Sequence, residues 1–214
     1  MVPPFEVSVF PDPAGSFTTA AAMVACTEKT LKEKFNTTLK NKRIIIYGGK
    51  GIVGGISSIM CAQAGSNCTI VGYDGIENVK KKAQEYKNRF SVDIEPGDGS
   101  SDELNSSFLP KADIIFCAAR AGTQVISLEQ LNLAKSLKII ADVNAVPPAG
   151  IEGVNLKDDN SKHPCNALSI GPLTSGDIKV KTQYKMFENM CKTDKPLFLN
   201  FNEALDISRE IIGL

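Results

Sequence analysis

The stretch that decides the fold runs from Lys42 to Gly54 and reads KRIIIYGGKGIVG. Its first half contains the apolar, β-branched run Ile44–Ile46, as expected for a strand that is covered on both faces. Its second half is the pattern GxGxxG, which stands where the strand ends and a helix of small residues begins. This order predicts a dinucleotide-binding unit, and a glycine-rich turn without a ligand is the alternative.

Each glycine of the pattern has an expected role. Gly49 permits a tight turn, Gly51 lets the backbone approach a pyrophosphate, and Gly54 allows the helix to pack closely on the strand. Free N–H groups at the helix N-terminus then face the phosphates and carry a partial positive charge. The predicted phosphate-binding residues are Gly49, Lys50, Gly51, Ile52 and Val53.

An acidic residue follows the second predicted strand, Cys68–Tyr73. Asp74 lies roughly 20 residues past the loop, where a carboxylate accepts hydrogen bonds from the adenosine ribose hydroxyls. A carboxylate there repels a 2′-phosphate, so Tyr73 and Asp74 are predicted in the cofactor site with NAD favoured over NADP. No arginine follows directly, although lysines 80–82 lie on the next helix. The alternative is that Asp74 is only a turn residue before Gly75.

Strands and helices alternate along the rest of the chain. Further strands are predicted at 92–94, 114–118, 139–141 and 167–170, and helices at 76–90, 127–134, 179–190 and 202–212. Asn202 is the expected N-cap of the last helix, and the polar segment 155–166 is interpreted as a loop. The predicted fold class is therefore α/β, a Rossmann-type doubly wound parallel sheet.

The N-terminal part precedes this unit. Prolines at positions 3, 4, 11 and 13 flank the alternating run Phe5–Phe10, which predicts one strand. A helix is expected over Ser16–Phe35, with Thr18 and Thr19 offering capping oxygens.

Composition narrows the class of protein. Hydrophobic residues make up 43% and charged residues 22% of the 214 residues, and the formal net charge is zero. Nucleic acid and anionic membranes are poor partners for such a chain, because both need a concentrated positive field. The six cysteines are scattered without a CxxC pair, which predicts buried reduced thiols and no metal site. No signal peptide or long apolar span is recognised, so a cytoplasmic protein is expected.

Three segments together resemble one family. They are Asp12–Ala22 (DPAGSFTTAAA), the loop Gly49–Gly54, and Ala141–Gly153 (ADVNAVPPAGIEG). The set resembles the methylene-tetrahydromethanopterin dehydrogenases of methylotrophic bacteria, relatives of the methylene-tetrahydrofolate dehydrogenases. The likeness extends from about Phe5 to the final helix, and its first and third segments are more specific than the loop.

The resemblance implies a reaction and a domain organisation. Such an enzyme moves a hydride from the methylene bridge of a reduced pterin to the nicotinamide of NAD or NADP and leaves a methenyl cation. Residues 36–190 would form the NAD(P)-binding domain and 191–214 a closing helix. Residues 1–35 would be a truncated remnant of the N-terminal, pterin-side domain. NADP-using relatives carry an arginine where this chain has Tyr73 and Asp74, which again favours NAD or a loose cofactor choice. A homo-oligomer is also expected.

Further site residues are expected beyond the carboxyl ends of the later strands, where open parallel sheets bind ligands. Ala118, Ala119 and Arg120 follow the fourth strand, and Asn144 follows the fifth, so all four are predicted to contact the cofactor. Asp142 either lines the same cleft or bonds nearby backbone N–H groups. Arg120 contacts a phosphate or an acidic substrate tail, or forms an exposed ion pair.

By resemblance, the pterin head would lie near Asp12, Ser16, Thr18 and Thr19. Lys179 and Lys181 on a late helix either hold a substrate anion or lie on a solvated face. The single histidine, His163, stands in a polar stretch and is predicted at the surface. No catalytic residue is assigned, because the hydride step needs chiefly a near-attack geometry.

Two other functions remain open from the sequence. One is a Rossmann dehydrogenase for another small substrate, and the other is a non-catalytic NAD(P)-binding subunit.

Overall fold

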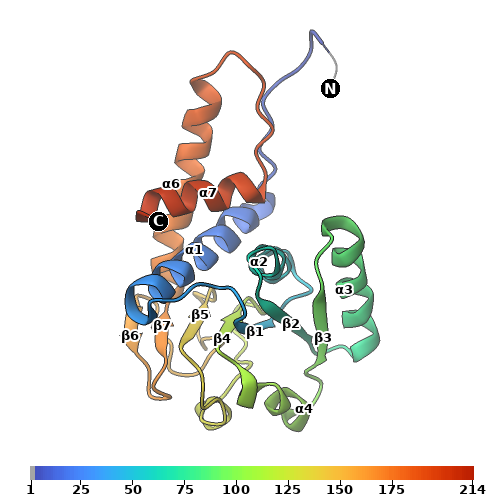
Figure 1. Cartoon of the computed structure of the whole chain (residues 1–214), viewed down its shortest axis with the longest axis vertical. Coiled ribbons are helices and arrows are strands. Elements are labelled where there is room, and N and C mark those ends of the chain that lie inside the picture. The colour runs from blue at the N-terminus through green and yellow to red at the C-terminus, as the bar shows by residue number, and fades with distance from the viewer. Residues whose placement is uncertain (1–2) are drawn as a thin grey trace.

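The computed structural model describes residues 3–214 and contains one seven-stranded sheet with helices on both faces (Figure 1). The strands are β1 (Arg43–Tyr47), β2 (Asn67–Gly72), β3 (Ile94–Asp98), β4 (Ile114–Cys117), β5 (Ile139–Asp142), β6 (Asp159–Lys162) and β7 (Leu168–Ile170). Their order across the sheet is β3-β2-β1-β4-β5-β7-β6, and only β6 runs antiparallel to its neighbour. The predicted Rossmann-type parallel sheet is confirmed.

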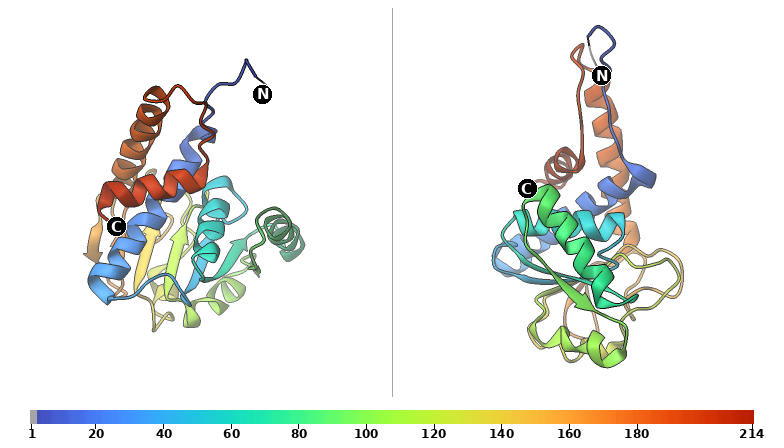
Figure 2. Two further views of the ribbon diagram at one scale, coloured as in Figure 1. Left: turned by 45° about the horizontal axis from the view of Figure 1, so that its top comes forward. Right: turned by 90° about the vertical axis from the view of Figure 1, so that its right-hand side faces the viewer.

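The helices form two unequal layers. They are α1 (Ser16–Phe35), α2 (Ile52–Gln63), α3 (Ile76–Phe90), α4 (Asp102–Ser107), α5 (Leu128–Leu131), α6 (Pro172–Cys191) and α7 (Phe201–Ile212). Helices α1, α2, α3 and α7 cover one face, while the short α4 and α5 lie on the other (Figure 2). Helix α6 packs against α1 and α7, and its C-terminal half extends beyond the sheet beside the N-terminal segment (Figure 1).

The apolar run in β1 is explained by these two layers. Ile44 and Ile46 join the core under the long helices, whereas Ile45 and Tyr47 join the core on the opposite face. Successive side chains of a strand point to opposite faces, so a strand covered on both sides needs an unbroken apolar sequence. This burial agrees with the position of β1 inside the sheet, between β2 and β4.

Helix α1 has the predicted bounds but a different cap. Thr18 and Thr19 were expected to supply capping oxygens, yet the Thr19 hydroxyl donates to the Gly15 carbonyl and the Thr18 hydroxyl donates to Asp12 Oδ2. The carboxylate of Asp12 caps the helix instead, because Oδ1 accepts from the backbone N–H of Phe17 at 2.8 Å and of Thr18 at 3.2 Å. A charged acceptor is the stronger partner for these unpaired N–H groups.

The predicted strand Phe5–Phe10 is wrong. Only Val9 makes a strand-like contact, a parallel bridge with Phe198 in which the Val9 N–H donates to the Leu197 carbonyl at 2.7 Å. The segment lies apart from the main sheet (Figure 1). Its only partner among the described residues is one short segment, so it forms a single bridge and not a strand. Residues 1–2 of the predicted segment 1–35 lie outside the described residues, and the predicted domain limits stay a prediction.

Two further expectations are corrected near the C-terminus. Segment 155–166, interpreted as a loop, contains β6, which pairs with β7 at the sheet edge. Helix α7 is capped by Asn200 rather than Asn202, because the Asn200 side chain accepts from the helix backbone and the Glu203 carboxylate accepts from the Asn200 N–H at 2.7 Å. This reciprocal pair is a capping box, and it lies two residues earlier than expected.

Ion pairing joins the first and last helices. Arg209 of α7 donates from Nε and Nη2 to the two carboxylate oxygens of Glu28 in α1, both at 2.7 Å.

Within residues 3–214, no helix combines the length and the apolar character needed to cross a membrane.

Candidate dinucleotide-binding site

The chain turns out of β1 at Gly48. This residue has φ +76°, and a Cβ added to it would overlap the backbone carbonyl of Ala118 at the end of β4. The tight-turn role expected of Gly49 therefore belongs to Gly48. A Cβ on Gly49 would instead collide with the side chain of Ile70 in β2, so Gly49 allows the loop to lie against the sheet.

Helix α2 starts with open N–H groups. Its N-cap is Gly51, an exposed residue in extended conformation, and no side chain among residues 3–214 caps the helix. The predicted close packing at Gly54 is confirmed, since a Cβ there would lie 2.6 Å from the Gly48 carbonyl oxygen. Free N–H groups and the helix dipole make this end a site for phosphate.

A tyrosine fixes the loop from behind. The hydroxyl of Tyr86 in α3 donates to the Gly49 carbonyl at 3.0 Å, and Gly55 leaves the space that this hydroxyl occupies. Burial raises the pKa of Tyr86, so the hydroxyl keeps its proton and remains a donor. The sequence predicted only a helix over 76–90 here, because the contact between Tyr86 and the glycine loop joins segments that are distant in the chain.

A groove of about 640 Å³ opens at the carboxyl ends of β1, β2 and β4. The sheet order reverses between β1 and β4, which is where doubly wound sheets bind nucleotides. The lining residues are Gly48, Lys50, Gly51, Val71, Gly72, Tyr73, Asp74, Ala118, Ala119, Arg120 and Thr123. The structure thus brings seven of the predicted cofactor residues into one groove, while Ile52 and Val53 lie in the adjoining first turn of α2.

Two charged residues meet in this groove. The ammonium of Lys50 forms an ion pair with Oδ1 of Asp74, and the Asn78 side chain donates to the Asp74 carbonyl oxygen at 2.9 Å. The Lys50 contact holds the pKa of the Asp74 carboxyl below its usual range, so Asp74 is ionised at neutral pH. The negative charge of Asp74, which was expected to favour NAD, is therefore paired with the lysine of the glycine loop.

The loop after β5 is held together by two buried polar side chains. Asp142 accepts from the backbone N–H of Asn144 at 2.8 Å and of Ile151 at 3.0 Å. Of the two roles expected for Asp142, the structure therefore shows the bonding of nearby backbone N–H groups. The Asn144 amide accepts from the Gly122 N–H at 3.2 Å and donates to the Pro148 carbonyl at 2.8 Å. Asn144 joins the loops after β4 and β5, and its predicted contact with the nicotinamide stays a prediction.

The predicted pterin residues lie at the start of α1. Thr18 is fully buried, and its hydroxyl donates to Asp12 Oδ2 at 2.7 Å, so it supports the backbone rather than facing a groove. Ser16 and Thr19 are half-buried and stay predictions. Lys179 lies beside Gly15 in this region, whereas Lys181 pairs with Asp177 on an exposed helix face.

A second groove adjoins the first at the glycine loop. Its volume is about 540 Å³, and Lys50 and Gly51 line both grooves. Pro11, Pro13 and Phe17 line it from the N-terminal segment, opposite α3. The segment that carries Asp12 therefore lies next to the glycine loop, although the two are far apart in sequence.

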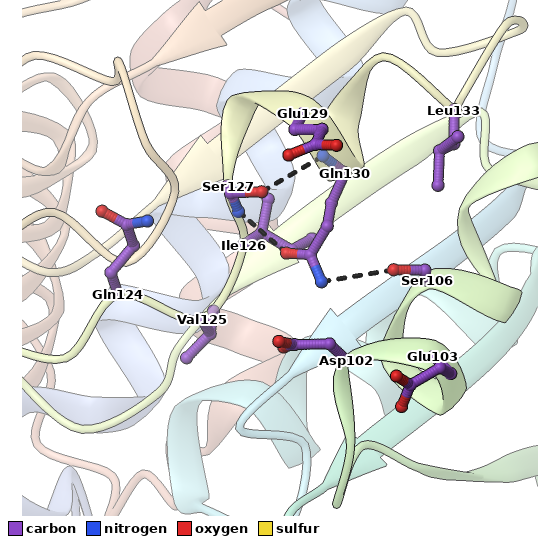
Figure 3. Close-up of a pocket in the computed structure, with 10 residues that line it drawn as sticks. All are labelled: Asp102, Glu103, Ser106, Gln124, Val125, Ile126, Ser127, Glu129, Gln130 and Leu133. Carbon is purple, nitrogen blue, oxygen red and sulfur yellow. Dashed lines mark hydrogen bonds between the residues drawn. The ribbon is translucent and has the colours of Figure 1, made fainter.

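A third groove of about 640 Å³ lies between α4 and α5 (Figure 3). The carboxylates of Asp102, Glu103 and Glu129 surround it, and the Gln130 amide donates to the Ser106 hydroxyl at 3.2 Å (Figure 3). No lysine or arginine is among the ten residues that line it. Three carboxylates repel a diphosphate, so this groove is unsuited to a dinucleotide.

The chain resembles two curated proteins of Methylorubrum extorquens. It is 42% identical to NAD(P)-dependent methylenetetrahydromethanopterin dehydrogenase over 99% of this chain and 72% of that protein. It is 27% identical to the bifunctional protein MdtA over 97% of this chain and 70% of that protein. The chain belongs to the NAD(P)-dependent methylenetetrahydromethanopterin dehydrogenase family. No protein-family model matches the sequence.

Solved structures show the same fold at low identity. An L-alanine dehydrogenase matches with a TM-score of 0.53 and 11% identity over 88% of this chain and 58% of that one. L-tryptophan dehydrogenase from Nostoc punctiforme matches with a TM-score of 0.53 and 14% identity over 92% of this chain and 51% of that one. These likenesses concern the fold alone and agree with the Rossmann-type topology.

The groove fits the dinucleotide that membership of this family implies. The exposed Gly51 leaves the start of α2 open for phosphates, and Asp74 offers a carboxylate oxygen at the end of β2 for sugar hydroxyls. Arg120, at the carboxyl end of β4, adds a positive charge to the same groove.

His163 takes no part in this groove. The predicted surface position is wrong, since His163 is only 2% exposed. One ring nitrogen, Nε2, lies 2.9 Å from the Glu152 carbonyl oxygen, and Nδ1 lies 3.0 Å from Cys165 Sγ. The chain folds back on itself around the ring, which the polar sequence around His163 did not indicate.

Proposed function

We propose that this chain catalyses NAD(P)-dependent oxidation of a methylene-tetrahydropterin, with methylene-tetrahydromethanopterin as the substrate. Family membership supports the reaction, and the glycine-loop groove supports the cofactor. The single observation that carries the proposal is that this groove joins the family's loop to Asp74 and Arg120 at the sheet's switch point.

The residues of the chain act by holding and orienting. The first turn of α2 and Arg120 bind the phosphates, while Asp74 accepts hydrogen bonds from the ribose. When bound, NAD(P) would supply the hydride acceptor, and the nitrogens that flank the substrate carbon would delocalise the positive charge left on it. No side chain needs to accept a proton in that step, which agrees with the burial of His163.

The N-terminal segment is proposed to lie beside the substrate. Its residues Pro11, Pro13 and Phe17 line the second groove next to Gly51, which supports a position beside the phosphate-binding loop. Ser16 and Thr19 remain the partly exposed polar candidates there.

The test is a matrix of substrates and nucleotides. Methylene-tetrahydromethanopterin and methylene-tetrahydrofolate are each mixed with NAD or NADP, and the absorbance of the reduced nicotinamide is followed. Turnover should be highest with the methanopterin substrate and should disappear in Gly51→Val. The matched control is Gly176→Ala in α6, where an added Cβ meets no atom within 4 Å. Nucleotide binding without turnover in any pairing would contradict the proposal and favour a non-catalytic subunit.

We also propose a cytoplasmic homo-oligomer. Large apolar side chains are exposed where α6 and the N-terminal segment extend beyond the sheet, including Phe5, Tyr184, Phe187 and Phe198. A surface of this kind supports association. Light scattering coupled to gel filtration measures the mass, and a monomer at high concentration would contradict the proposed association.

A further inference from the structure

The Lys50–Asp74 ion pair spans the opening of the cofactor groove. Lys50 occupies the variable position between Gly49 and Gly51, and both partners of the pair line the groove. The lysine stem passes over the end of β2, because a Cβ on Gly72 would lie 3.2 Å from Lys50 Cε. The phosphate-binding loop therefore directs a cation onto the residue that recognises the adenosine ribose.

The two partners differ in how firmly they are held. Asp74 stands before the N-terminus of α3, and Asn78 of that helix donates both to its backbone carbonyl and, at 3.3 Å, to Oδ2. Lys50 has a long flexible stem, a side chain that is 28% exposed, and no ion-pair partner other than Asp74 among residues 3–214. Asp74 has a short side chain and a second partner in Asn78, so Lys50 is the partner that moves when the groove is filled.

Charge decides what each arrangement accepts. An isolated carboxylate at Asp74 suits a ribose with free hydroxyls and repels a 2′-phosphate. A cation within reach of that carboxylate cancels the repulsion and can donate to the phosphate oxygens. Arg120 is on the same groove, whereas Lys80 and Lys82 are paired with Glu77 and Glu85 on α3.

We propose that Lys50 is the residue that lets this site take both NAD and NADP. With NAD, Lys50 stays on Asp74 while the other carboxylate oxygen accepts from the ribose. With NADP, Lys50 leaves Asp74 and binds the 2′-phosphate, which shields that phosphate from the carboxylate. The inference rests on the proposed dinucleotide site and assigns its nucleotide selectivity to one side chain of the glycine loop.

Binding titrations test this without relying on turnover. The full chain is titrated by calorimetry with NAD and NADP, and with adenosine 5′-phosphate and adenosine 2′,5′-bisphosphate, which isolate the effect of the 2′-phosphate. Lys50→Met keeps the stem and removes the charge, so it should weaken NADP binding by about 10- to 100-fold, as for the loss of a charged hydrogen bond. NAD binding should change by less than about 3-fold. Lys81→Met, on the exposed face of α3, is the matched control and should change neither.

The reciprocal variant sharpens the result. Asp74→Asn removes the repulsion and one ribose acceptor, so it should strengthen NADP binding and weaken NAD binding. Equal losses for both nucleotides in Lys50→Met would place the lysine on the shared pyrophosphate and overturn the inference alone. Unchanged affinities for both nucleotides would overturn it as well. If the wild-type chain binds neither nucleotide, the proposed dinucleotide site and this inference fail together.

Discussion

Gly48 provides the sharpest test of how the loop is built. Substitution by alanine places a Cβ on a residue with φ +76°, which costs about 1–2 kcal/mol in the left-handed region. The same Cβ overlaps the Ala118 carbonyl, and moving backbone out of the way costs about 1–3 kcal/mol more. The lower entropy of an unfolded chain with alanine returns about 0.4–1 kcal/mol. Gly48→Ala should therefore lower the free energy of unfolding by about 1–5 kcal/mol.

Urea unfolding followed by circular dichroism measures this change. In a chain of this size each kcal/mol lowers Tm by roughly 2–4 °C, so a thermal scan checks the same quantity. Gly51→Ala is the control, because its φ is −74° and the nearest atom to the added Cβ is the Gly48 carbonyl oxygen at 3.2 Å. That variant should lose less stability than Gly48→Ala, and it should bind nucleotide more weakly. Wild-type stability in Gly48→Ala would refute the assignment of the turn.

Three further predictions concern contacts that support the site. Tyr86→Phe removes the hydrogen bond to the Gly49 carbonyl, so calorimetry should show weaker nucleotide binding and urea a loss of about 1 kcal/mol in stability. Arg209→Met breaks the two-pronged pair with Glu28 and should cost about 1–2 kcal/mol in urea unfolding, less at high salt. Burial raises the pKa of the Asp142 carboxyl, so this group binds a proton more readily in the folded protein than in the unfolded chain. The stability that protonated Asp142 contributes is therefore lost as pH rises through its folded-state pKa. Asp142→Asn should flatten that part of the urea-midpoint profile across mildly acidic pH, and an unchanged profile would contradict the assigned cause.

Local patterns were sufficient for most of the sheet and for the first long helix. The run Ile44–Ile46 predicted a strand buried on both faces, and the structure places it inside the sheet between β2 and β4. Helix α1 has the predicted bounds, Ser16 and Phe35. These features depend on side chains a few residues apart, so periodicity reports them directly.

Expectations failed where a residue's partner comes from a distant segment. The strand predicted at Phe5–Phe10 had the right alternation, but the fold provides only one short partner near Phe198. His163 stands in a polar sequence, yet the fold buries it against the Glu152 carbonyl. Alternation and polarity indicate which structure a segment could adopt, but the neighbouring segments in the fold decide whether it forms a strand or is buried.

The sequence by itself determined that this chain is a Rossmann-type protein with a glycine loop, because those signals are periodic or contiguous along the chain. Only the tertiary structure decided that Gly48 forms the turn, that Tyr86 supports the loop, and that Lys50 rests on Asp74. Each of these depends on segments that are separate in the sequence and meet only when β1, β2, β4 and α3 are packed together. Periodicity along the chain does not specify which distant segments come into contact, so these contacts are decided by tertiary packing.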